Sequence, residues 1–201
     1  MPHTIQLSFT KRPSRQHGGS LAVGRRRAWC PLNPKLSHHL TLKSYQASGG
    51  RCLLKHKTLI RAVLDKAARR FGVTVYNHAV AGNHLHVLVK GRSRLGLQNF
   101  FRVFAGHTAQ QILQMCPLPK SCGGGASTID SGRQPCAKNR RKFWGYLIYS
   151  RIVSWGSEFK TVLRYIDRNT LEALGLIAYQ PRHTKQIGGR KVLKAKLRNT
   201  S

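Results

Sequence analysis

The chain has 201 residues, which is enough for one well-packed domain and short for two. It carries 36 lysines and arginines against five acidic residues, and this formal net charge of +31 at pH 7 implies a polyanionic partner, nucleic acid before anionic membrane. The five carboxylates are scattered along the sequence, which argues against a carboxylate-rich two-metal nuclease and against a paired-carboxylate hydrolase.

The N-terminal region, residues 1–35, has the composition of a flexible basic arm. It contains seven lysines and arginines, no acid, and glycines and prolines that interrupt any periodicity. Its start lacks the apolar core of a signal peptide, and no apolar run in the chain approaches the roughly 18 residues that a membrane span needs. We therefore expect a cytoplasmic, nucleoid-associated protein with no membrane partner.

Residues 36–178 contain the predicted domain. It begins with a strand in "HHLTLKSY", where leucines alternate with polar residues. A helix is predicted over 57–71, because its apolar residues recur at helical spacing. The runs "VTVYNHAVA" and "HLHVLVK" predict two strands, and Gly82 and Asn83 lie between them at the distance of a hairpin turn.

The second half of the domain continues this alternation. Apolar residues at steps of three and four predict a helix around 97–108, and "FWGYLIYSRIV", residues 143–153, predicts a strand. A third helix is predicted over 157–175. The stretch 116–142 has loop composition and unusual length, and a basic tail, residues 179–201, follows the domain. This order of elements favours an α+β fold of ferredoxin-like (RRM-like) type, an antiparallel sheet with helices on one face.

Two histidines stand at the start of the strand in "HLHVLVK". Side chains alternate along a strand, so His84 and His86 share one face, and the leucine and valines between and after them share the other. The apolar face should meet the helices, which leaves both imidazoles on the open face, close enough to hold one cation. An H-x-H pair is a weak signal alone. In a basic domain almost without acids, however, a divalent ion could bridge the imidazoles to a phosphate oxygen.

Several of these segments resemble one known family. "NHLHVLV", after a strand and a tight turn, resembles the HUH motif (His, a bulky hydrophobic residue, His) of the single-tyrosine transposases of insertion sequences. "RYIDRN" followed by "GLI" resembles the C-terminal helix of the REP-associated branch of that family. "HHLTLKS" and "KFWGYLIYS" are similar to the family's first and last strands, so the resemblance extends over residues 37–178. Thr170 stands where the family typically has proline.

The resemblance to REP-associated tyrosine transposases implies an HUH endonuclease that cleaves and rejoins single-stranded DNA carrying a REP-like hairpin. A tyrosine oxygen attacks the scissile phosphate and forms a 5′-phosphotyrosine intermediate. The implied nucleophile is Tyr165, and the implied ligands of Mg²⁺ or Mn²⁺ are His84, His86 and Asn169, one turn beyond the tyrosine. The protein would act as a monomer or a homodimer.

Helical geometry is consistent with this role for Tyr165. The apolar stripe of the third helix is formed by Phe159, Val162, Leu163 and Ile166. Tyr165 lies on the flank of that stripe, at the border between helix and sheet, and Asn169 projects from the same flank. A boundary tyrosine that packs its ring and exposes its hydroxyl is the alternative interpretation.

The candidate DNA-binding residues are Arg25, Arg26, Arg27, Lys43, Arg164 and Arg168. Arg164 and Arg168 share the helix of Tyr165, and we expect them to bind the DNA backbone. Tyr76, Trp144 and Tyr146 are candidates either for stacking on unpaired bases or for packing within the fold. His39, on the first strand, is a candidate partner of the histidine pair.

Two other functions remain open from the sequence. A plasmid or phage replication initiator or relaxase would use the same HUH motif on a different DNA. A non-catalytic RNA- or DNA-binding protein is the alternative from another class, since RRM-like sheets with basic tails commonly bind RNA.

Overall fold

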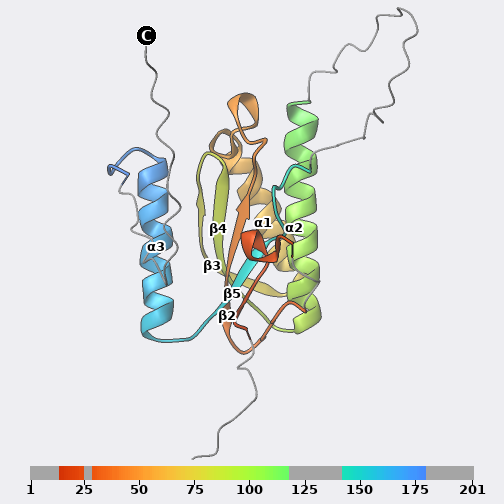
Figure 1. Ribbon diagram of the computed structural model, residues 1–201, viewed down its shortest axis with the longest axis vertical. Helices are drawn as coiled ribbons and strands as arrows, with labels where there is room; N and C mark the ends of the chain where they lie inside the picture. The colour runs from red at the N-terminus through yellow and green to blue at the C-terminus, as the bar shows by residue number, and fades with distance from the viewer. Residues whose placement is uncertain (1–13, 25–28, 118–141, 180–201) are drawn as a thin grey trace, which may run out of the picture.

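The computed structural model describes residues 14–24, 29–117 and 142–179. These residues form one antiparallel sheet with the strand order β1-β5-β2-β4-β3, together with three α-helices (Figure 1). The strands are β1 (Gln16–His17), β2 (Ser37–Lys43), β3 (Val73–Val80), β4 (His84–Gly91) and β5 (Tyr149–Val153). The α-helices are α1 (Lys57–Phe71), α2 (Arg94–Met115) and α3 (Ser157–Ala173). The short 3-10 helices are η1 (Gly19–Ala22), η2 (Gly49–Arg51) and η3 (Leu53–His56).

The order β2-α1-β3-β4-α2-β5 is the ferredoxin-like pattern predicted from the sequence. It places the four strands in the spatial order β5-β2-β4-β3, each antiparallel to its neighbour. The hairpin between β3 and β4 turns at Gly82 and Asn83, where the Ala81 amide donates to the His84 carbonyl oxygen at 2.9 Å. The predicted α+β fold class is therefore confirmed.

The two faces of the sheet carry different helices. Leu85, Val87 and Val89 of β4 join the large core beneath α1 and α2. α3 lies on the opposite face, where it packs on a second, smaller apolar cluster that includes Leu88 of β4 and Ile166 of the helix (Figure 1). The expectation that all helices share one face is wrong for α3. α3 therefore covers part of the face that carries the histidine pair, because the helix packs on the apolar side chain of Leu88 there.

The predicted strand over 143–153 is shorter than expected. β5 begins at Tyr149, and the residues before it make only an isolated bridge, between Trp144 and Ser44 at the end of β2. The Trp144 indole instead donates to the Ala105 carbonyl oxygen of α2 at 2.8 Å, and the Gly145 amide donates to the Lys43 carbonyl oxygen at 2.9 Å. These contacts hold 143–148 as an irregular segment that connects the end of β2 with the middle of α2.

The region predicted as an arm, residues 1–35, contributes to the sheet. β1 pairs with β5 and forms an edge of the sheet. This strand is too short to leave an alternating pattern in the sequence. Residues 118–141 of the predicted loop and 180–201 of the predicted tail lie outside the described residues. Among the helices that are described, none is long and apolar enough to cross a membrane.

Candidate active site

The two histidines of β4 project from one face, as the alternation predicts. The centroids of the His84 and His86 rings lie 5.0 Å apart. Neighbouring β2 pairs its Lys43 with His84 and its Thr41 with His86, so these polar side chains form a continuous patch across both strands.

His86 lies in a buried polar cluster with two side chains of β2. Its Nδ1 atom is 3.1 Å from the Thr41 hydroxyl and 3.2 Å from Nε2 of His39. The rings of His39 and His86 stack with their centroids 5.2 Å apart. Burial and, to a smaller extent, the nearby Arg151 guanidinium lower the pKa of His39 to about 4, so His39 is neutral at physiological pH. His39 thus contacts one member of the histidine pair, His86, and its supporting role stays a prediction.

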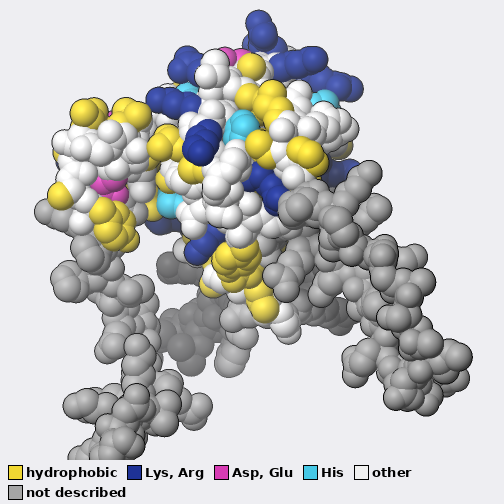
Figure 2. All heavy atoms as spheres, turned by 90° about the horizontal axis from the view of Figure 1, so that it is seen from above, with side chains coloured by type: hydrophobic (Ala, Val, Ile, Leu, Met, Phe, Trp, Pro, Cys, Tyr) yellow, Lys and Arg dark blue, Asp and Glu magenta, His cyan; other side chains and the backbone are white. Residues whose placement is uncertain are grey.

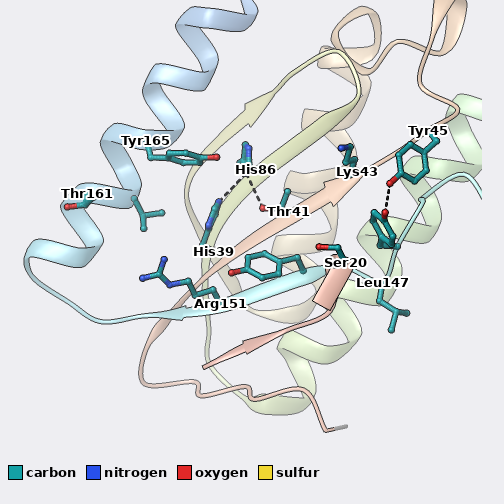
Figure 3. A pocket seen from close by; sticks show the side chains of 14 residues that line it. Ser20, His39, Thr41, Lys43, Tyr45, His86, Leu147, Arg151, Thr161 and Tyr165 are labelled. Atoms are coloured by element: carbon teal, nitrogen blue, oxygen red, sulfur yellow. Dashed lines mark hydrogen bonds between the residues drawn. The ribbon is translucent and has the colours of Figure 1, made fainter. Parts of the chain in front are cut away.

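α3 brings Tyr165 to these histidines. The helix is anchored by Val162 and Ile166, which pack on Leu88 beneath them. Tyr165 lies beside this apolar contact, and its side chain extends toward His86 (Figure 3). The Tyr165 ring meets the ring of His86 edge-on at 5.2 Å between centroids, and the ring of His39 at 5.8 Å.

Two of the three remaining site candidates on α3, Asn169 and Arg168, have partners within the helix. Asn169 is buried, and its amide nitrogen donates to the Tyr165 carbonyl oxygen at 2.6 Å. Arg168 pairs with Glu172 through a contact of 2.9 Å between Nε and Oε1. Arg164 is exposed to solvent. The structure thus brings Tyr165, His84 and His86 together, whereas the ligand role of Asn169 and the DNA contacts of both arginines stay predictions.

A cleft of about 580 Å³ opens between α3 and this face of the sheet (Figure 3). Its lining residues are Gly19, Ser20, His39, Thr41, Lys43, Tyr45, His86, Tyr146, Leu147, Tyr149, Arg151, Thr161, Val162 and Tyr165. The charged side chains among them, Lys43 and Arg151, are both cationic. Seen along the molecule in Figure 2, lysine and arginine side chains also spread over the described surface, with few acidic ones between them. The cleft therefore suits an anionic ligand.

A salt bridge with Glu158, which the sequence did not indicate, holds Arg151 in the cleft. The guanidinium contacts Oε1 of Glu158 at 2.5 Å, while Oε2 of the same carboxylate contacts Arg15 at 3.2 Å and accepts from the Ser154 amide at 2.8 Å. Burial acts to raise the pKa of Glu158, but the Ser154 amide and the two arginines outweigh it and hold that pKa below its usual value. One carboxylate thus connects β5 and the residue before β1 to the first turn of α3.

Sequence reasoning missed several residues of the cleft. Thr41 could have been found, because it shares a strand face with His39 in the alternating "HHLTLK". Arg151 and Tyr149 could not, because the register between β2 and β5 is set by a pairing of distant segments that leaves no local pattern. Of the other predicted DNA contacts, Lys43 lines the cleft, and Arg25, Arg26 and Arg27 lie outside the described residues.

The histidine pair fits a metal ion held by neutral imidazoles. Nδ1 of His84 donates to the Asn83 side-chain oxygen at 2.8 Å, which assigns the lone pair of the neutral ring to Nε2, as in metal-binding histidines. The described residues contain no group of three or more His, Cys, Asp or Glu side chains with the arrangement of a metal site. A third ligand would have to be an amide oxygen or the substrate.

The family model for IS200-like transposases matches residues 51–169, more than half of the chain. The chain belongs to the IS200-like transposase family. The match includes the histidine strand, the helix of Tyr165 and Asn169, and the matched family acts on DNA, so DNA is the partner of this IS200-like transposase and DNA cleavage its class of activity.

Comparison with solved structures finds similarity to a chain described as a "putative transposase" from Deinococcus radiodurans. It is 14% identical, with a TM-score of 0.38, and the alignment covers 72% of this chain and 96% of the other. No curated protein matches the sequence. The family assignment favours a transposase over the two alternatives left open by the sequence, a replication initiator or relaxase and a non-catalytic RNA- or DNA-binding protein.

Proposed function

We propose that this IS200-like transposase cleaves and rejoins single-stranded, hairpin-bearing DNA through a 5′-phosphotyrosine on Tyr165. The observation that carries the proposal is the position of Tyr165, whose ring lies 5.2 Å from that of His86 in a cleft whose described lining contains no acidic residue. Such a cleft favours a phosphodiester over a cationic or neutral substrate, because the charged side chains of its described lining, Lys43 and Arg151, attract the phosphate.

In the proposed reaction, the phenolic oxygen of Tyr165 attacks the phosphorus of the scissile diester. The new bond joins that oxygen to phosphorus, and the bond from phosphorus to the 3′ oxygen of the upstream nucleotide breaks. The phenol gives up its proton and the departing oxygen takes one up, so a free 3′-hydroxyl forms. Because the diester energy is kept in the phosphotyrosine, the reverse reaction rejoins DNA without a nucleotide cofactor.

His84 and His86 would hold a divalent ion, Mg²⁺ or Mn²⁺, with Asn169 as the third protein ligand. When bound, the ion would polarise the scissile phosphate and offset its charge. His39 and Thr41 have a different role: both contact Nδ1 of His86 and thereby orient its ring.

Arg151 would bind a non-bridging phosphate oxygen beside Tyr165. A guanidinium presents a fork of N–H donors that matches phosphate geometry, and Glu158 restrains the Arg151 side chain before substrate arrives. Restraint before binding lowers the entropy lost when the complex forms.

A first experiment separates cleavage from binding. Wild-type protein, Mn²⁺ and a 3′-labelled single-stranded hairpin should give a labelled protein band that survives denaturation, whereas a fully duplex DNA should not. His84→Ala and His86→Ala should lose this band by at least roughly 100-fold, as expected for loss of phosphate polarisation, and keep most of their DNA affinity. Full activity of these variants, or of wild type in EDTA, would overturn the proposed metal site.

A further inference from the structure

The end of the cleft away from Tyr165 is aromatic and exposed. Tyr45 is 62% exposed, and its ring meets that of Tyr146 edge-on with centroids 5.5 Å apart. The two hydroxyl groups form a hydrogen bond, drawn in Figure 3 at the Tyr45 end. Lys43 holds its ammonium group 5.6 Å from the centre of the Tyr45 ring. Tyr45 and Tyr146 are called the distal tyrosine pair below, and Lys43 is the cation beside it.

The backbone holds the distal tyrosine pair in place. The Gly145 amide donates to the Lys43 carbonyl oxygen at 2.9 Å, which joins the segment of Tyr146 to the end of β2. A Cβ atom at Gly145 would lie 2.5 Å from two ring carbons of Tyr45, closer than real Cβ contacts allow. The ring therefore packs directly on glycine backbone. An exposed aromatic ring fixed in this way has already lost the rotational freedom that binding a flat ligand would otherwise remove.

We propose that the distal tyrosine pair stacks on an unpaired base of the DNA strand that occupies the cleft. This inference rests on the proposed function, because it takes the scissile phosphate to lie beside Tyr165. Tyr165 at one end, and Tyr45 and Tyr146 at the other, line the same cleft. A strand that leaves the scissile phosphate along the cleft would thus place a neighbouring base at Tyr45 and Tyr146.

The chemistry of the distal tyrosine pair favours a base of single-stranded DNA over other flat ligands. Stacking on tyrosine needs an exposed π face, which a base offers only when it is unpaired, and a cation beside the ring suits the phosphate attached to that base. Aromatic rings combined with a cationic groove are the usual means by which single strands are bound without sequence readout. The site would add affinity for unpaired DNA and distinguish it from duplex.

The test compares two probes of equal length on the full-length protein, oligothymidylate and a strand of abasic deoxyribose phosphates. Both carry the same phosphates, so the basic residues elsewhere contribute equally, and the ratio of the two dissociation constants reports contacts to bases. Wild type should bind oligothymidylate more tightly, and Tyr45→Leu and Tyr146→Leu should each lower that preference by roughly 5- to 100-fold.

Two control variants complete the design. Tyr45→Phe keeps the ring and loses the hydrogen bond to Tyr146, so it should retain the wild-type ratio. Leu95→Ala removes an apolar side chain of α2 that is 66% exposed and does not line the cleft, and it should also retain the ratio. An unchanged ratio in both Tyr45→Leu and Tyr146→Leu, or no preference for oligothymidylate in wild type, would overturn the inference.

Failure of the proposed function gives a different result. If wild type forms no covalent band with any single-stranded hairpin but the distal tyrosine variants lose base preference, the stacking site stands and the role of Tyr165 falls. If the covalent band forms and the ratio does not change, the proposed function stands and the distal site falls.

Discussion

His38 and His39 are consecutive in β2, so their side chains lie on opposite faces of the sheet. His39 faces the cleft and contacts His86, whereas His38 is fully buried on the other side, where its Nε2 accepts from the Asn33 amide at 3.1 Å. Burial lowers the pKa of His38 to about 4. Only the unprotonated ring nitrogen can accept that hydrogen bond, so the contact itself requires the neutral form.

His38 should make the stability of the fold depend on pH. Its folded pKa of about 4 lies below the ordinary 6.5, so the unfolded chain binds more protons between these values, and stability is lost as pH falls through this window. The loss attributable to His38 should reach roughly 3 kcal/mol near pH 4. Urea unfolding of wild type and His38→Gln at several pH values measures it. The two proteins should differ in pH dependence over this window, and parallel curves would show that His38 does not titrate as described.

The elements of the fold were predictable to the extent that their signals are local. The helix at 57–71, the hairpin at Gly82 and the shared face of His84 and His86 depend on spacing and turn chemistry, and all three are found. The position of α3 was not predictable, because its apolar stripe fits either face of the sheet. Likewise, Arg151 enters the cleft through the pairing of β5 with β2, a contact between distant segments.

Glu158 of α3 contacts Arg15, Arg151 and the Ser154 amide, and we expect its negative charge to contribute more to the stability of the fold than its shape. Glu158→Gln keeps an oxygen that can accept from the Ser154 amide but removes the partner of Arg15 and Arg151. Because both arginines are partly exposed, the loss should be modest, about 1 kcal/mol in the free energy of unfolding. Urea unfolding at low and high salt measures it. The difference from wild type should shrink at high salt, and a difference that salt does not change would contradict an electrostatic link.

The molecule as a whole combines a formal net charge of +31 with a cleft whose described lining contains cations and no acid. Under the proposed function, the cleft would select where DNA binds, and the remaining lysines and arginines would supply affinity that does not depend on sequence. Part of the N-terminal region belongs to the sheet through β1, so its removal would disturb the fold as well as the charge.

The C-terminal tail, residues 179–201, offers a cleaner test of that affinity. It carries seven lysines and arginines, and it begins after α3, the last helix of the described residues. The logarithm of the affinity for single-stranded DNA should fall with the logarithm of salt concentration by about 0.7 per phosphate contacted, and deletion of 180–201 should make this slope shallower. Filter binding across a salt series measures both slopes. Identical slopes would show that the tail does not contact DNA.

The central claim is that Tyr165, and no other tyrosine of the cleft, is the nucleophile. Tyr165→Phe keeps the ring that meets His39 and His86 and removes only the attacking oxygen. Tyr149→Phe is the matched control, because Tyr149 lines the same cleft and burial raises the pKa of its phenol, which disfavours it as a nucleophile.

The decisive measurement is the formation of a denaturation-resistant adduct with a 3′-labelled single-stranded hairpin, followed by identification of the labelled peptide. Wild type and Tyr149→Phe should form the adduct on the peptide that contains Tyr165, and Tyr165→Phe should bind the DNA without forming it. An adduct that persists in Tyr165→Phe, or that disappears in Tyr149→Phe, would contradict the assignment of the nucleophile to α3.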